Sequence, residues 1–211
     1  MPCAGSASRS KKVLFASERD EARRAAWRAA LAGVDPARLV FVDETGTNLS
    51  MTRRYGRAKQ GQRVVAQVPR NHGPNVTLIA AMDQDGLLGE LTITGALDGL
   101  AFEVYVTRIL VPALWPGDLV LLDNLSAHKC KIARIWIEAA GCHVVFLPPY
   151  SPDFNPIELA FSKLKSFLRG AGARTRAELD QAITAALGTI TSQDAAGWFA
   201  HCGYQQPPQL L

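Results

Sequence analysis

The chain has 211 residues, of which 48% are apolar, 20% charged and 8% aromatic, and its formal net charge is +4. This length and composition fit one large globular domain with a sizeable core, and they exclude a disordered or fibrous protein. No apolar run approaches the roughly 20 residues that span a bilayer. The first dozen residues lack the apolar stretch of a secretory signal. We therefore expect a cytoplasmic protein that does not contact a membrane.

In chain order, the sequence predicts a disordered segment (1–16) and then a capped helix with a linker (17–38). The arginines of this helix, Arg23, Arg24 and Arg28, either are solvated, which we expect, or meet phosphate. Short, mostly apolar strands are expected at residues 39–44, 75–82, 87–94, 118–124 and 143–147. Helices are expected at about 99–114, 129–140, 156–169, 176–187 and from 192 onward. The basic stretch 52–63, which contains two glycines, is typical of a loop or a loose hairpin. This order predicts a mixed α/β sheet flanked by helices.

Charge is distributed unevenly along the chain. Residues 51–74 carry six Lys or Arg and no carboxylate, whereas residues 75–124 carry seven carboxylates and one Arg. Residues 125–176 are basic again, with eight Lys or Arg against three carboxylates. Two basic segments around an acidic one suit a polyanionic ligand that meets a cation-binding centre.

Two of the predicted buried strands end in aspartate, at Asp43 and Asp123. Ligands of open α/β sheets collect at the carboxyl ends of the strands, so these two side chains lie together if the strands are parallel neighbours. Like charges at that distance need a cation or a shared proton. Mg²⁺ takes oxygen ligands, and two or three carboxylates hold it well. The sequence therefore indicates a divalent-cation site.

A third carboxylate, Glu158, follows Asp123 after 34 intervening residues and lies near the start of a predicted helix. On that helix Glu158 shares a face with Ser162 and Lys165, away from the apolar stripe of Ile157, Ala160, Phe161, Leu164 and Leu168. Two interpretations stay open. Glu158 either occupies the capping-box position behind an N-cap at Asn155 or faces the metal as a third ligand. Asp153, in the preceding proline-rich loop, is a weaker candidate for the third ligand.

Three segments carry a family resemblance: FVDETG, LLDNLSAHK and LPPYSPDFNPIELAFSKLK. They resemble the catalytic blocks of the DDE transposases (DDE superfamily endonucleases), and in particular the bacterial insertion-sequence branch of the mariner superfamily. The 34-residue spacing is the signature of that branch, and the resemblance extends over roughly residues 39–204. It implies an RNase H-like mixed five-stranded sheet, with the first and fourth strands adjacent, in a catalytic domain 39–205 that is followed by a tail, 206–211. It also implies that Asp43, Asp123 and Glu158 are the catalytic metal ligands.

The resemblance implies metal-dependent DNA cleavage and strand transfer during transposition of an insertion sequence. Phosphodiester hydrolysis needs a deprotonated water and a stabilised leaving oxygen, which two Mg²⁺ ions roughly 4 Å apart supply together, with Mn²⁺ as a substitute. Asp43 is expected to bridge the two ions, while Asp123 and Glu158 each complete one site. The same centre can then activate a DNA 3′-OH in place of water.

Four polar neighbours have expected supporting roles. Strand alternation directs Glu44 to the face opposite Asp43, which favours a structural role over ligation. Asn124 and His128 belong to the DNxxxH block of the resembled family and orient substrate or water, although His128 is equally suited to cap the next helix. Asn155 is expected to be an N-cap first and a substrate contact second.

Double-stranded DNA, as transposon ends and target, is the partner that the resemblance implies. Phosphate contacts of this kind give affinity without sequence recognition, and the affinity falls with salt. One basic group, which includes Tyr55, is expected to track the DNA backbone: Arg53, Arg54, Arg57, Lys59 and Arg63. A second is expected to hold the strand at the active site: Lys163, Lys165 and Arg169.

Only 38 residues precede the first predicted strand, too few for the helix-turn-helix region that family members carry there. The chain is therefore expected to be a truncated copy or the downstream half of a frameshifted product, acting at the bacterial nucleoid. Pairing of transposon ends implies a homodimer or a partner transposase chain. A second interpretation is a catalytically silent remnant that binds DNA or dimerises and so modulates a full-length transposase. No Gly-rich phosphate loop follows a strand, which argues against a nucleotide-binding enzyme.

Overall fold

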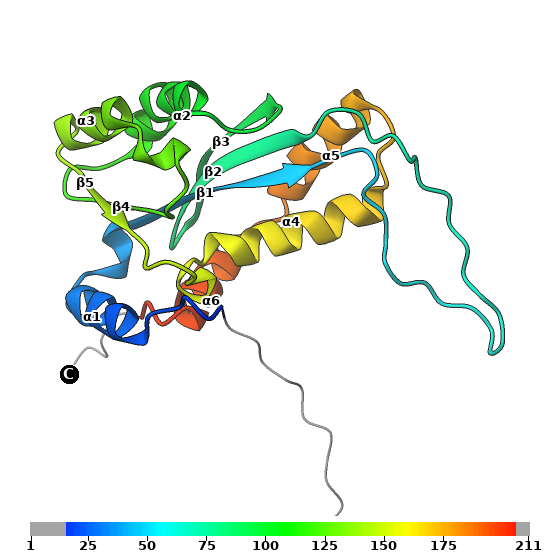
Figure 1. Ribbon diagram of the computed structural model, residues 1–211, viewed down its shortest axis with the longest axis horizontal. Coiled ribbons are helices and arrows are strands. Elements are labelled where there is room, and N and C mark those ends of the chain that lie inside the picture. Colours follow the sequence, from blue (N-terminus) through cyan, green and yellow to red (C-terminus); the bar gives the residue numbers. More distant parts are fainter. Residues whose placement is uncertain (1–15, 206–211) are drawn as a thin grey trace, which may run out of the picture.

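A computed structural model describes residues 16–205 of the chain and contains a mixed five-stranded sheet with the strand order β3-β2-β1-β4-β5 (Figure 1). All five predicted strands are present. The predicted disordered segment 1–16, except its last residue, and the predicted tail 206–211 lie outside the described residues. The strands are β1 (Leu39–Thr47), β2 (Val76–Asp83), β3 (Gly86–Thr94), β4 (Leu119–Leu122) and β5 (His143–Phe146).

The central strand β1 runs antiparallel to β2 and parallel to β4. Its register pairs Leu39 with Leu119 and Val42 with Leu122, so the carboxyl ends of the two parallel strands meet at one edge. Strand β5 continues the parallel half beyond β4. The predicted adjacency of the first and fourth strands is confirmed.

In the described part of the chain six α-helices accompany the sheet, at or near the predicted positions: α1 (Glu21–Leu31), α2 (Gly99–Tyr105), α3 (Lys131–Ala139), α4 (Ile157–Ala171), α5 (Arg176–Leu187) and α6 (Ser192–His201). One prediction differs in detail, because α2 gives way to a π-helical turn and a short 3₁₀ turn instead of continuing to Leu114. Pro112 explains the change, since it lacks the N–H that a regular helix needs there. Within residues 16–205, no helix is both long and apolar enough to cross a bilayer.

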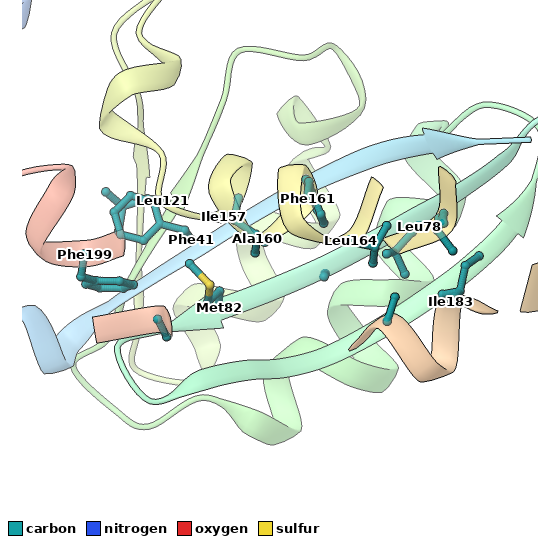
Figure 2. Close-up of a cluster of buried hydrophobic side chains, with 14 of the residues drawn as sticks. Phe41, Leu78, Met82, Leu121, Ile157, Ala160, Phe161, Leu164, Ile183 and Phe199 are labelled. Atoms are coloured by element: carbon teal, nitrogen blue, oxygen red, sulfur yellow. The ribbon is translucent and has the colours of Figure 1, made fainter. Parts of the chain in front are cut away.

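Strand alternation divides the core into two layers, one on each face of the sheet. Phe41 packs with α4, α5 and α6, and Val40 and Val42 pack with α2 and α3 on the other face. Every member of the predicted α4 stripe is buried. Figure 2 shows the layer on the side of α4, α5 and α6, where helix and strand side chains pack together: Phe41, Leu78, Met82, Leu121, Ile157, Ala160, Phe161, Leu164, Ile183 and Phe199.

Helix α1 is capped by Asp20, whose side chain accepts from the Arg23 N–H, but the prediction that all its arginines are solvated is wrong. Arg24 is only 4% exposed, and its guanidinium donates to both carboxylate oxygens of Asp153 at 3.0 and 2.6 Å. Arg24 and Arg28 also stack over the ring of Phe154, at 3.9 and 4.2 Å from its centroid. The arginines therefore anchor α1 to the loop that precedes α4.

The Arg24–Asp153 pair makes the free energy of unfolding depend on pH in the acid range. Burial raises the pKa of Asp153, but the hydrogen bonds and charge of Arg24 outweigh burial and hold the pKa below its usual range. The pair therefore stabilises the fold above the unfolded pKa of about 4 and ceases to do so as the pH falls through the folded pKa. We expect urea unfolding to find Asp153→Asn less stable than wild type at pH 7, with a smaller difference at pH 3. An equal difference at both pH values would contradict this account.

The segment between Thr47 and Val76 contains neither helix nor strand and extends away from the sheet (Figure 1). The basic stretch has no strand pairing, but it turns back on itself where the Gln62 N–H donates to the Lys59 carbonyl at 3.0 Å, so it is consistent with the predicted loop or loose hairpin. Arg174 ties the start of the loop to the α4–α5 connection, because its Nη1 donates to the carbonyl oxygens of Leu49 and Met51, both at 3.1 Å.

Candidate active site

The fold brings the three predicted carboxylates to one cleft of about 500 Å³. Asp43 lies in β1 one residue beyond its last pairing with β4, and Asp123 directly follows β4, so the parallel register places them next to each other. Glu158 projects from the first turn of α4. The cleft is also lined by Glu44, Asn124, Asn155 and the loop residues 147–152.

Asp43 is the most constrained of the three acids. It is only 7% exposed; one carboxylate oxygen accepts a hydrogen bond from the Glu44 N–H and the other from the Asn155 side-chain amide, each at 2.8 Å. Burial, followed by the charges of Glu44, Glu158 and Asp123, raises the pKa of Asp43 to about 8. A cation in the cleft would lower the pKa of Asp43 again, because a nearby positive charge favours the ionised carboxylate.

Asn155 holds Asp43 and does not cap α4, so its predicted primary role is wrong. Pro156 occupies the N-cap position, and α4 has no side-chain cap. The capping-box interpretation of Glu158 is therefore also wrong, because it required Asn155 as the N-cap. Asn155 is 4% exposed, and its Oδ1 is buried without a hydrogen-bond partner in the structure. The Asn155 side chain therefore donates from its NH₂ group to Asp43, while its Oδ1 remains an unused acceptor beside the carboxylates.

His128 connects two acids from beneath the cleft. It lies buried in the 3₁₀ turn Ala127–Lys129, with Nδ1 2.6 Å from Asp123 Oδ1 and Nε2 3.2 Å from Glu44 Oε2. Burial lowers the pKa of His128, but its contacts with Asp123 and Glu44 outweigh burial and raise the pKa to about 9. An imidazolium at neutral pH thus neutralises part of the acidic cluster. The alternative that His128 caps α3 is wrong, because α3 has no side-chain cap.

The two faces of β1 divide the remaining roles as alternation predicts. Asp43 meets Asn155 on the α4 side, whereas Glu44 meets His128 on the α2 side, where the His128 ring lies 4.8 Å from that of Phe102. The Glu44–His128 pair is a contact that the sequence pattern did not predict. Both residues stood out in the sequence, but no local signal joins positions on separate strands.

The ends of the neighbouring strands and the proline-rich loop form the rest of the cleft wall. The Asn124 side chain donates to the Leu147 carbonyl at 2.7 Å and so joins the ends of β4 and β5. Tyr150, between prolines, adopts a left-handed backbone with a φ of 55° and lines the cleft half exposed. Asp153 is turned to Arg24 and does not line the cleft, which leaves Glu158 as the third carboxylate there.

Within residues 16–205, no three His, Cys, Asp or Glu side chains already converge as a formed metal cage. Asp123 explains part of this, since its Oδ1 accepts from the Leu125 N–H and contacts His128. Its side chain is nevertheless 44% exposed, and Glu158 is exposed at the cleft. The site is thus one fixed carboxylate, Asp43, flanked by two accessible ones.

Residues 38–180 match the family model described as DDE superfamily endonuclease. The chain belongs to this family. The match runs from β1 into the first half of α5 and includes Asp43, Asp123 and Glu158. No curated protein matches the sequence.

Solved structures of Mos1 transposase are similar to this DDE endonuclease domain. The Mos1 paired-end complex with left transposon end is 17% identical, with a TM-score of 0.75 over 93% of this chain and 63% of that one. The catalytic domain of Mos1 mariner transposase is 13% identical, with a TM-score of 0.67 over 92% of both chains. The match supports an RNase H-like catalytic fold. The chain spans less than two thirds of the transposase in the paired-end complex.

The predicted DNA-binding residues of this DDE domain lie mostly away from the carboxylates. Arg53, Arg54, Tyr55, Lys163 and Arg169 line a second cavity of about 850 Å³ beside the C-terminal half of α4. Arg57, Lys59 and Arg63 are exposed farther along the loop, and Lys165 lines neither cavity. The Arg53 guanidinium lies against Gly170, where a Cβ would be 3.4 Å from it.

The helix separates this second cavity from the active cleft. Arg169 follows Glu158 by eleven positions, which corresponds to about 16 Å along α4. Lys163 is already engaged, donating to the Thr189 carbonyl at 2.7 Å and to Asp194 at 2.6 Å. Arg169 thus lines the second cavity and lies away from the carboxylates, unlike the position predicted for it at the active site.

Proposed function

We propose that the chain is the catalytic domain of an insertion-sequence transposase of the mariner superfamily, which cleaves DNA and transfers its 3′ ends at the bacterial nucleoid. The observation that carries the proposal is the cleft shared by Asp43, Asp123 and Glu158, which come from β1, the end of β4 and the first turn of α4. The 34-residue spacing between the last two acids supports the insertion-sequence branch. The end-recognition domain of such an enzyme is not part of residues 16–205.

The residues of the cleft fit a pair of divalent cations, Mg²⁺ or Mn²⁺. The donors are carboxylate oxygens, which such cations prefer, and Asp43 is a buried acid in need of a positive neighbour. Asp43 would contact both ions, with Asp123 on one and Glu158 on the other. When bound, the ions supply the nucleophile-activating and leaving-group charge of phosphodiester cleavage.

The protein contributes orientation and charge balance to this reaction. Asn155 holds the Asp43 carboxylate in one orientation through its side-chain amide. His128 aligns Asp123 and offsets the charge of Glu44. The side chains of Asp123 and Glu158 are exposed at the cleft, so each has rotamers free to turn toward a cation beside Asp43. The rigid loop with Tyr150 limits one side of the substrate path.

A plasmid-nicking assay tests the proposal. The chain should convert supercoiled plasmid to nicked circles with Mg²⁺ or Mn²⁺, and EDTA should prevent the conversion. Glu158→Gln should remove the activity, whereas Asp180→Asn, on the exposed surface of α5, should leave it unchanged. DNA binding without nicking, under conditions where the chain is folded, would instead support the silent remnant that modulates a full-length transposase.

DNA binding should depend on the cavity beside α4. Because 16 Å corresponds to about five base pairs of a duplex, cations there would hold the phosphate backbone about half a turn from the cleavage site. We expect Arg54→Ala and Arg169→Ala each to weaken duplex binding for all sequences alike and to reduce the salt slope of log K by about 1. Fluorescence anisotropy over a salt series measures this, with Arg23→Ala on α1 as the control. An unchanged slope in both cavity variants would show that the DNA lies elsewhere.

Transposition joins two ends, and the Mos1 structures include paired-end complexes. We therefore include pairing of two catalytic chains in the proposal, either as a homodimer or with a partner transposase chain. Two copies would present two carboxylate clefts to two DNA ends.

A further inference from the structure

Helix α3 exposes an apolar stripe to solvent. Ile132, Ile135, Trp136 and Ala139 follow the i, i+3, i+4, i+7 spacing of one helix face, and we call them the α3 stripe. Ile132, Ile135 and Trp136 are 49%, 62% and 49% exposed, although the same helix buries Ala133 and Ile137 against the sheet. The helix is therefore apolar on two faces, of which the sheet covers one.

Segments that adjoin α3 in the fold also expose apolar side chains. Leu100 and Val104 on α2, which packs beside α3 in Figure 1, and Trp115 before β4 are exposed as well. Among the described residues, the other large exposed apolar side chains belong to the loop 48–75 or line one of the two cavities. Single exposed apolar residues are ordinary, but a gathering of them on one helical layer indicates an interaction surface.

The position and charge of this surface argue against DNA as its partner. Helices α2 and α3 cover the face of the sheet opposite α4, which carries the basic cavity. The charged residues of α3 are Lys131, Arg134 and Glu138, and the last two already form an ion pair at 2.7 Å. A phosphate backbone requires a row of free cations, which α3 does not offer.

The charges of α3 suit a second copy of the same helix. They run from Lys131 and Arg134 in the first half to Glu138 near the end. An antiparallel copy reverses this order, which brings Lys131 of one helix within two positions, or about 3 Å along the helix axis, of Glu138 of the other. The same arrangement, with its two-fold axis between Ile135 and Trp136, pairs Ile135 with Trp136 and Ile132 with Ala139. Such self-complementarity is what an isologous interface needs.

We propose that the α3 stripe is the two-fold interface between two copies of this chain, joined through antiparallel α3 helices. The inference rests on the pairing included in the proposed function and names the surface for it. Because the interface lies opposite α4, it leaves the basic cavity free for DNA in both copies. It is tested without DNA or metal, so it can fail while the proposed cleavage activity stands.

Sedimentation equilibrium of the full 211-residue chain tests the interface. Wild type should be a dimer at micromolar concentration, and Ile135→Glu should weaken the dimer by about 100-fold or more, as expected for a buried anchor. Val65→Glu adds the same charge at an exposed apolar site of the loop and should leave the dimer intact. Circular dichroism should find both variants folded, because both residues are exposed.

A charge exchange tests the antiparallel register. Lys131→Glu should weaken the dimer by about ten-fold, since two like-charged contacts replace two favourable ones. Adding Glu138→Lys to the same chain should restore the affinity. A monomeric wild type, a dimer that tolerates Ile135→Glu, or a double variant weaker than the single one would overturn the proposal.

Discussion

We expect Asp43→Asn to lower metal-dependent cleavage by on the order of 10³-fold or more. Asp43 is the fixed acid of the cleft, held by the Glu44 N–H and by Asn155, and it is the proposed contact to both cations. An amide carries no charge, so it cannot replace the carboxylate between two cations. Nicking rates over a Mn²⁺ series measure the effect, and wild-type rates in the variant would end the assignment.

The same variant should be more stable than wild type in EDTA, by at least about 1 kcal/mol at neutral pH. The substitution removes a carboxyl group that the metal-free fold must either protonate or bury as a charge beside Glu44, Glu158 and Asp123. The new amide can donate to Asn155 Oδ1, which has no partner in the structure, once the Asn155 amide rotates. The gain should coincide with the loss of activity, as for a site whose strain serves function.

The stability advantage of Asp43→Asn should depend on pH, and its direction follows from the pKa of Asp43. The pKa of Asp43 is about 8 in the fold and about 4 in the unfolded chain, so wild-type stability without metal falls as the pH rises between these values. Asp43→Asn lacks this loss, and its advantage should therefore grow from pH 5 to pH 8.5 in urea unfolding. Asp123→Asn should show no such gain, because His128 already stabilises that carboxylate. An Asp43→Asn variant less stable than wild type at pH 8.5 would contradict the account.

Arg24→Ala should cost about 3 kcal/mol of unfolding free energy, the largest stability effect we expect from a single charged residue. The change removes two charge-assisted hydrogen bonds to Asp153 and empties the space over Phe154. It thereby detaches α1 from the loop that leads into α4. Chemical denaturation measures the loss.

A matched variant on the same helix provides the control for Arg24. Arg23 is exposed, and Arg23→Ala should change stability by less than about 0.5 kcal/mol. Adding Asp153→Ala to Arg24→Ala should cost less than the two single changes together, because the pair is lost only once. Equal losses from Arg23→Ala and Arg24→Ala would show that the contact has no specific role.

The sequence predicted the strands and the acid positions because both depend on local patterns. A run such as Leu39–Val42 can only be buried on both faces, and the aspartate that follows such a run must lie at the end of the strand. The parallel pairing of β1 with β4 then brings Asp43 and Asp123 together. Glu158 required the helix register, which the apolar stripe of α4 supplied.

Contacts between distant segments could not be predicted in the same way. Arg24 resembled a solvated residue of a polar helix face, because its partner Asp153 is 129 positions away. Asn155 had the sequence context of an N-cap, and only the position of β1 beside α4 turns its amide toward Asp43. The Pro112 effect on the helix after β3 was local and could have been predicted from the missing N–H.

A crystal structure of the chain with Mn²⁺, with the ions located by anomalous scattering, tests the central claim most directly. We expect two ions in the cleft, with Asp43 contacting both, Asp123 contacting one and Glu158 the other, and with Asp123 and Glu158 rotated toward Asp43. Ions bound elsewhere, or a cleft in which Asp43 contacts no ion at saturating Mn²⁺, would contradict the two-cation centre.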